Sequence, residues 1–251
     1  MEHYALPAQV FGAGLVFARV SSFMMLMPGV GETAIPTRIR LAFAFLLSLT
    51  LYPLVRTALP AEPDSLGGLF SVIALEIGIG LGLGALLRMF LGALAVAGEV
   101  ISLQTTLAMS QTTNPLQAQP SATIGAFLSL VGLTLVFTTN LHQLFIAGLV
   151  QSYHLFPVGK GAPAHDFALL AIETFGRTFS LGVQLAAPVI VFAMVFNVAL
   201  GMVARIMPQF QVFAAATPLI LILGLSVFAL SVGAIGLVWL DRVQAFAERL
   251  I

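Results

Sequence analysis

Long apolar runs separated by short polar stretches dominate the chain. Six of these runs extend approximately over residues 8–27, 39–55, 66–98, 123–156, 167–205 and 212–239. A helix of about 20 apolar residues is long enough to cross the hydrocarbon core of a bilayer. Runs of this length therefore predict membrane helices rather than strands. The pattern indicates an all-α fold of about six hydrophobic helical segments.

Helix-stop residues and run lengths refine these boundaries. The first run ends at Pro28-Gly29, and Pro53 is expected to close the second. The third run is much longer than a bilayer requires, so we expect it to tilt, break or leave the membrane plane. The fourth run contains a polar kink, Asn140-Leu-His-Gln143, and the sixth is followed by a short amphipathic tail over residues 241–251.

Composition places the chain among integral membrane proteins. Hydrophobic residues make up 59% of the chain and charged residues 8%, and the mean hydropathy is +1.06. A soluble domain carries about 25% charged residues, so this chain could not cover a water-facing surface. The net charge is zero and the basic residues are scattered, so nucleic-acid binding is not indicated. Cysteine is absent, which excludes disulfides, thiolate metal sites and cysteine nucleophiles.

Seven charged residues lie inside or at the edges of the apolar runs: Arg19, Glu76, Arg88, Glu99, Glu173, Arg177 and Arg205. A charge at the bilayer centre costs about 2.5–3.5 kcal/mol, so these side chains must face protein or water. Because acids and histidines do not cluster, ion pairs between helices are favoured over a proton or ion relay. Glu173 and Arg177 are expected to pair locally. Arg88 and Glu99 share a helix face about 16 Å apart, so neighbouring subunits are their expected partners.

Closely spaced glycines predict tight helix packing. The stretch Gly78-Ile-Gly-Leu-Gly-Leu-Gly84 contains two overlapping GxxxG pairs, Gly78/Gly82 and Gly80/Gly84. Such pairs let apolar helices approach one another closely, so Gly78 and Gly82 are assigned to subunit packing. A dinucleotide-binding fingerprint at the same place is rejected, because no strand precedes it.

A polar loop over residues 110–121 interrupts the apolar pattern without carrying any charge. Its amide and hydroxyl groups can bond to one another and line a wet cavity, as irregular backbone at membrane depth requires. An ordinary solvent loop is the alternative. The polar and proline residues assigned to it are Ser110, Gln111, Thr112, Thr113, Asn114, Pro115, Gln117, Gln119 and Pro120.

Enzymatic motifs are not found in the sequence. The four histidines lack metal-ligand spacing, and no HExxH, GxSxG or P-loop pattern occurs. His142 is interpreted as a buried histidine with satisfied hydrogen bonds. We therefore expect no catalytic residues, no metal and no cofactor.

Several blocks resemble the R subunit of the type III export gate, the FliR/SpaR family of bacterial export proteins. The first blocks are Gly98-Glu-Val-Ile-Ser-Leu-Gln104, Asn140-Leu-His142 and His154-Leu-Phe-Pro-Val-Gly159. A more specific block runs from Asn197 through Arg205-Ile-Met-Pro208-Gln209 to Phe213, followed by Thr217-Pro218. The resemblance covers essentially the whole chain and is closer to the flagellar members than to the virulence injectisome. It departs from the family inside the polar loop, where Asn114 replaces an expected acidic residue.

The resemblance implies a subunit that helps form and seal the channel through which unfolded flagellar proteins cross the bacterial inner membrane. One such subunit would join P- and Q-type gate subunits, with the B-type switch subunit around the mouth of the channel. Some helical hairpins would be lifted out of the membrane plane, and proton motive force would mainly drive export. Residues 1–251 would form a single membrane-embedded export-gate domain in the flagellar basal body, in contact with lipid.

The same resemblance gives the polar residues their expected roles. The loop over residues 110–121 matches the family's plug. Buried polar contacts to other subunits are expected for Arg88, Glu99, Gln104, Asn140, His142, Asn197, Arg205, Pro208 and Gln209. An injectisome subunit, a secondary transporter of a small solute and a structural scaffold stay as alternatives. A transporter usually shows an internal repeat, and none is evident in this sequence.

Overall fold

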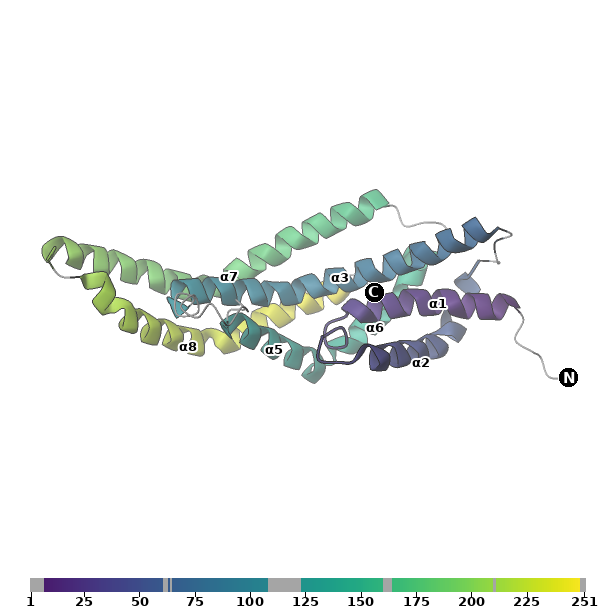
Figure 1. The fold of residues 1–251 in the computed structure, drawn as a ribbon, viewed down its shortest axis with the longest axis horizontal. Coiled ribbons are helices and arrows are strands. Elements are labelled where there is room, and N and C mark those ends of the chain that lie inside the picture. Colours follow the sequence, from purple (N-terminus) through teal and green to yellow (C-terminus); the bar gives the residue numbers. More distant parts are fainter. Residues whose placement is uncertain are drawn as a thin grey trace. The chain divides into compact units, whose positions relative to one another are not determined.

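The structure is a computed structural model that describes residues 7–60, 63, 65–107, 123–159, 164–209 and 211–248. Every regular element in these residues is a helix (Figure 1). The elements are α1 (Pro7–Leu26), α2 (Thr37–Val55), the 3₁₀ helix η1 (Arg56–Ala58), α3 (Leu66–Gln104), α5 (Thr123–Thr138), α6 (Leu141–Leu155), α7 (Ala164–Ile206) and α8 (Val212–Glu248). Within the described residues, five helical segments are long and apolar enough to cross a membrane, and α5 with α6 gives a sixth if counted as one bent span. The all-α, multi-pass prediction is confirmed.

The helices contribute to two compact units. Unit 1 comprises Met1–Phe90, Val136–Phe175 and Val243–Ile251, and unit 2 comprises Leu91–Leu135 and Gly176–Arg242. Long helices such as α3 continue from one unit into the other. The expectation of one membrane-embedded domain over residues 1–251 stays a prediction.

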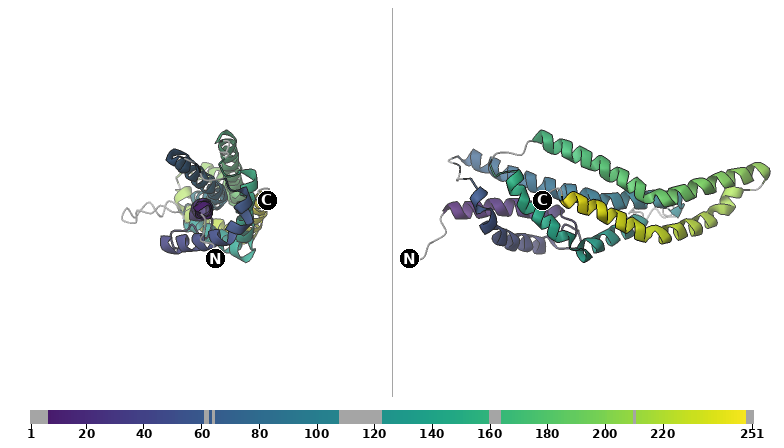
Figure 2. Two further views of the ribbon diagram at one scale, coloured as in Figure 1. Left: turned by 90° about the vertical axis from the view of Figure 1, so that its right-hand side faces the viewer. Right: turned by 180° about the vertical axis from the view of Figure 1, so that it is seen from behind.

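The connection over residues 27–36 makes α1 and α2 a hairpin, whose two helices lie side by side (Figure 2). Helix α1 ends at Leu26, and Gly29 then adopts φ +95°, a value that favours glycine. At Gly31 a Cβ atom would lie 2.6 Å from the carbonyl oxygen of Met25, so the turn has no room for a side chain. The predicted stop at Pro28-Gly29 is therefore confirmed.

The predicted closure of the second run at Pro53 is wrong. Helix α2 continues past Pro53 to Val55, and the amide of Arg56 still donates to the carbonyl oxygen of Tyr52. Proline removes its own amide donor, but the flanking residues keep their helical bonds. The 3₁₀ turn η1 then ends the segment.

Helix α3 is continuous over 39 residues, or about 58 Å. Of the outcomes expected for the third run, a break is therefore wrong, and the helix extends beyond the predicted end at Gly98 to Gln104. Thr106, with φ 62°, lies just past this end. Its left-handed conformation, which a β-branched residue rarely adopts, takes the backbone out of the helical path.

The predicted polar kink in the fourth run is confirmed. Helices α5 and α6 meet at an angle of 74°. Asn140 lies between them with φ 59° and ψ 19°, the left-handed conformation that asparagine tolerates better than most residues.

Helix α8 runs unbroken from Val212 to Glu248, beyond the predicted end of the sixth run at Trp239, so most of the predicted amphipathic tail is the last part of this helix. No glycine or proline stands between Trp239 and Glu248 to end it. Within unit 1, Val243 and Ala247 are buried, and the Phe246 ring lies 4.7 Å from that of Phe90 between centroids. The amphipathic pattern therefore marks a docked helix end.

Candidate functional site

Arg19 of α1 and Glu76 of α3 form a completely buried ion pair in unit 1. Arg19 Nε donates to Glu76 Oε2 at 2.6 Å, and Arg19 Nη2 donates to Oε1 at 3.0 Å. Neither side chain has exposed surface. Two parallel bonds between a guanidinium and a carboxylate fix both distance and orientation. The prediction of ion pairs between helices is confirmed for these two charges.

Helix α6 supplies the remaining contacts of the guanidinium. Arg19 Nη1 donates to Ser152 Oγ at 3.1 Å, and Nη2 donates to the carbonyl oxygen of Phe156 at 2.9 Å. The Tyr153 ring lies 4.0 Å from the guanidinium carbon. The arginine hub, defined as Arg19, Glu76, Ser152, Tyr153 and Phe156, therefore links α1, α3 and α6.

The chemistry of the arginine hub favours a structural role, holding three helices together, over a ligand-binding site. Bringing two charges out of water is expensive, and good geometry with further hydrogen bonds offsets that penalty. Here the carboxylate of Glu76 is engaged on both oxygens. Sequence reasoning missed Ser152, Tyr153 and Phe156. Ser152 and Tyr153 stand out only as polar residues inside an apolar run.

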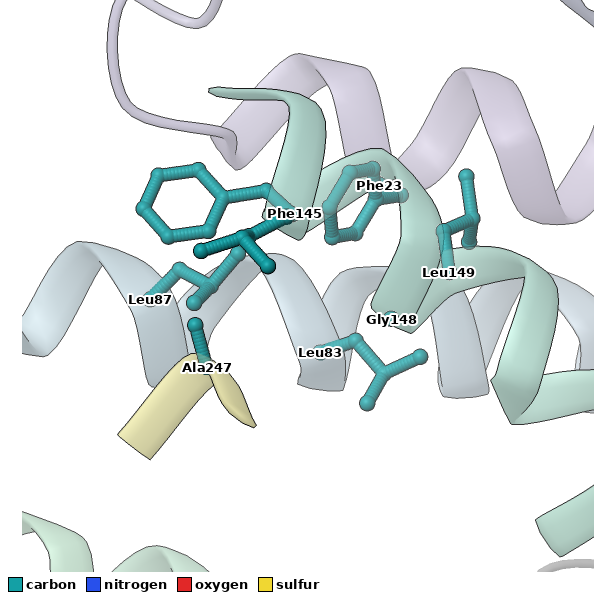
Figure 3. A pocket seen from close by; sticks show the side chains of 8 residues that line it. Phe23, Leu83, Leu87, Phe145, Gly148, Leu149 and Ala247 are labelled. Atoms are coloured by element: carbon teal, nitrogen blue, oxygen red, sulfur yellow. The ribbon is translucent and has the colours of Figure 1, made fainter. Parts of the chain in front are cut away.

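Helices α1, α3 and α6 also contact one another through apolar side chains. Phe23 of α1, Leu83 and Leu87 of α3, and Phe145 of α6 surround a cavity of about 10 Å³ (Figure 3). Ala247 of α8 also lines it. The space suffices for one water at most, and its lining gives that water no polar partner. The region around the hub is therefore closely packed.

Glycines let α3 approach α1 beside the hub. A Cβ atom on Gly80 would overlap Ser22 Oγ and the carbonyl oxygen of Arg19, and one on Gly84 would lie 2.8 Å from Leu26 Cβ. The Gly80/Gly84 pair therefore packs helix on helix, as its spacing predicts.

The other pair, Gly78/Gly82, differs. A Cβ on Gly82 would overlap the ring of Phe167, whereas one on Gly78 meets nothing within 4 Å. Gly82 thus packs inside the chain. Subunit packing by Gly78 stays a prediction.

Arg88 has weak partners inside the chain, and its expected contact with another subunit stays a prediction. Arg88 Nη1 donates to the carbonyl oxygen of Gly31 at 3.4 Å, and Nη2 lies 3.9 Å from Glu32 Oε2. Glu32 was overlooked because it lies in the turn between two apolar runs.

Most of the residues predicted to make buried polar contacts with other subunits are exposed on the chain itself. Gln104 and His142 are half-buried. The His142 ring packs 5.4 Å from the Phe137 ring, and its Nδ1 lies 3.5 Å from the carbonyl oxygen of Val136. The exposed residues of this set are Glu99, Asn140, Asn197, Arg205, Pro208 and Gln209. Their burial against other subunits stays a prediction.

The specific block of the sequence analysis forms the end of the α7–α8 hairpin in unit 2. Leu200, Val212, Ala216 and Ile220 make a buried cluster that packs the two helices together. Pro208 and Gln209 lie in the exposed turn beyond it. This end of the hairpin therefore has an apolar contact between its two helices and a polar, exposed turn.

The polar loop over residues 110–121 lies outside the described residues, so its predicted role is not tested by the structure. The expectation that the chain holds no metal can be compared with the described residues only. In the chain segments that the structure describes, no group of three or more His, Cys, Asp or Glu residues is placed to hold a metal ion.

Comparisons with known proteins identify relatives along almost the whole chain. The family described as "Bacterial export proteins, family 1" matches residues 10–246. The "Flagellar biosynthetic protein FliR" of Caulobacter vibrioides is 53% identical over 248 residues, covering 99% of both chains. The proteins of that name from Aquifex aeolicus and Escherichia coli are 32% and 30% identical, covering 92% and 84% of this chain and 89% and 80% of their own lengths.

Proposed function

From the premise that the chain belongs to the bacterial export proteins of family 1, we propose that it is a subunit of the flagellar type III protein export gate. The end-to-end similarity to a flagellar relative, 53% identical over 99% of both chains, carries this proposal. The chain is a multi-pass protein of the bacterial inner membrane and belongs to the flagellar basal body. It helps form the channel through which unfolded flagellar proteins leave the cell.

The role proposed for the polar loop is that of a plug. Residues 110–121 carry amides, hydroxyls and two prolines but no charge. Such groups can bond to one another when the channel is closed. Without fixed charge, the loop holds no group that would trap a passing acidic or basic segment. Loops also open at lower free energy than packed helices, so this segment suits a movable seal.

The chain works together with other components of the flagellar export apparatus. We assign P- and Q-type gate subunits and the B-type switch subunit as its direct partners. Support comes from polar side chains such as Asn197 and Arg205, which are exposed on a long apolar helix. Lipid tails are unfavourable neighbours for these groups, whereas polar groups of another subunit satisfy them.

The arginine hub holds α1, α3 and α6 together within unit 1. The Arg19–Glu76 ion pair has no net charge and no exposed surface, and Arg19 also donates to Ser152 and to the carbonyl oxygen of Phe156. This arrangement suits a conduit and seal rather than a catalyst. The injectisome alternative is less favoured because the three relatives described above carry the flagellar name. A small-solute transporter has no specific observation in its favour.

Cross-complementation tests the proposed function. The chain is produced in a Caulobacter vibrioides strain that lacks its own 53% identical relative. We expect flagellar proteins to reappear in the medium and motility to return, as they do with the strain's own gene. The proposal fails if the chain reaches the membrane and co-purifies with the gate, yet secretion stays at the level of the empty vector.

A further inference from the structure

Two arginines converge on the turn between α1 and α2. Arg40 of α2 and Arg88 of α3 each direct Nη1 at the carbonyl oxygen of Gly31, at 3.5 and 3.4 Å. Arg40 Nη2 donates to Thr37 Oγ1 at 3.4 Å. All three distances are longer than those of strong hydrogen bonds to charged donors. The turn therefore holds two guanidinium groups only loosely.

Negative charge at this turn does not balance the two arginines. Glu32 lies 3.9 Å from Arg88 Nη2, the loose end of the ion-pair range. No ion pair of Arg40 occurs in the described part of the chain. The side chains of Arg88 and Glu32 are 41% and 32% exposed, so a ligand can reach them. The cluster thus carries an uncompensated and accessible positive charge.

The position of the turn indicates that it contacts the lipid headgroups. It joins two helical segments of membrane-crossing length, Gln9–Leu26 and Thr37–Ala58. The end of such helices lies at the depth of the lipid phosphates. Immediately beyond the turn, Ile39, Phe43 and Leu46 of α2 are 59%, 45% and 62% exposed. Their spacing places them on one apolar helix face.

We propose that Arg40 and Arg88 bind the phosphodiester group of an anionic phospholipid, whose acyl chain lies against the exposed face of α2. Guanidinium groups match phosphate oxygens in both charge and planar geometry. A zwitterionic headgroup adds an ammonium charge beside the two arginines, so an anionic headgroup is preferred. The turn thereby becomes a lipid-binding site that anchors the α1–α2 hairpin at the membrane surface.

Lipid binding by the purified gate complex tests this proposal. The complex in nonionic detergent is titrated with phosphatidylglycerol or phosphatidylcholine, and bound lipid is counted by native mass spectrometry. We expect one phosphatidylglycerol fewer per complex in Arg40→Gln/Arg88→Gln than in the wild type at the same lipid concentration. Each single substitution weakens binding by roughly fivefold, the usual effect of one basic contact to an anionic headgroup.

Two control variants show whether the loss of lipid is specific to these two arginines. Arg56→Gln removes an exposed arginine beyond the opposite end of α2 and is expected to leave lipid binding unchanged. Arg88→Lys keeps the charge and tests the site if the double variant does not assemble; it retains more phosphatidylglycerol than Arg88→Gln. Equal binding of both lipids, or loss of lipid in Arg56→Gln, overturns the proposal. Unchanged phosphatidylglycerol binding in both single Gln variants overturns it as well.

Discussion

Arg19 and Glu76, 57 residues apart in the chain, meet in a two-bond ion pair from which solvent is completely excluded. Replacing either residue by leucine leaves the other charge buried and unpaired. We expect Arg19→Leu and Glu76→Leu each to lower the free energy of unfolding by about 3–5 kcal/mol. Thermal unfolding of the purified gate complex measures the loss. Arg56→Leu, which removes an exposed arginine, serves as the matched control.

The double variant Arg19→Leu/Glu76→Leu distinguishes a structural ion pair from a proton relay. Because both charges are removed, we expect it to regain most of the stability lost in either single variant. Ser152 and the carbonyl of Phe156 still lose their donor, so recovery is incomplete. Additive losses in the double variant contradict a coupled pair. A double variant that assembles normally but no longer supports proton-driven secretion favours the relay alternative.

The hydroxyl and the ring of Tyr153 are expected to have opposite effects. The ring lies over the Arg19 guanidinium, whereas the buried hydroxyl has no hydrogen-bond partner among the described residues. Tyr153→Phe keeps the ring and removes an unsatisfied group, so stability should stay unchanged or rise by up to about 1 kcal/mol. Tyr153→Leu loses the cation–π contact and part of the packing, and should cost about 2 kcal/mol or more. The same unfolding measurement compares them, and a larger loss in Tyr153→Phe contradicts the geometry.

Local patterns predicted much of the fold. The turn at Pro28-Gly29 and the kink at Asn140 depend on residues whose backbone preferences act over a few positions, and both are confirmed. Hydropathy was less informative about helix ends. It measures composition in a window, so it placed a boundary near Gly98 where α3 in fact continues to Gln104. The proline rule failed at Pro53, because the flanking residues keep their helical bonds.

The candidate site was harder to predict because its residues come from distant segments. Arg19 bonds to Glu76 and to Ser152, which is 133 residues away. An apolar run containing one charge shows that a partner is needed but gives no direction in space. Likewise, the weak contact between Arg88 and Glu32 joins α3 to the turn before α2, and the pattern of the apolar runs does not show that these segments meet.

The two glycine pairs of α3 provide a matched comparison. Gly80→Ala would drive a methyl group into Ser22 Oγ and the carbonyl of Arg19, so we expect a loss of about 1–3 kcal/mol from overpacking. Gly78→Ala faces open space within the chain and should gain up to about 1 kcal/mol of helix stability. Unfolding of the complex and co-purification of its subunits measure both. Gly78→Leu tests the predicted subunit contact, since unchanged co-purification in that variant contradicts it.

Asn140 holds the bend between α5 and α6 in a left-handed conformation. Asn140→Gly should preserve this bend, because glycine adopts positive φ without strain. Asn140→Ala should cost about 1–2 kcal/mol, the usual penalty for an L-residue in that region. The exposed Gln143→Ala, three residues along, is a control with ordinary helical backbone. Equal stability of the Gly and Ala variants contradicts a requirement for the left-handed bend.

Deleting residues 110–121 tests the proposed plug. If this uncharged loop seals the channel, its removal opens a path for ions and small solutes while the gate still assembles through its packed helices. We expect faster uptake of a small impermeant solute by cells that carry the deletion, with unchanged co-purification of the P- and Q-type subunits. Replacing the same twelve positions with a Gly/Ser sequence is the matched control for length, because it keeps the span but removes the amide groups and the prolines. A partial leak is expected from this replacement, since flexible glycines order poorly. Normal impermeability of the deletion variant, in a fully assembled gate, contradicts the plug.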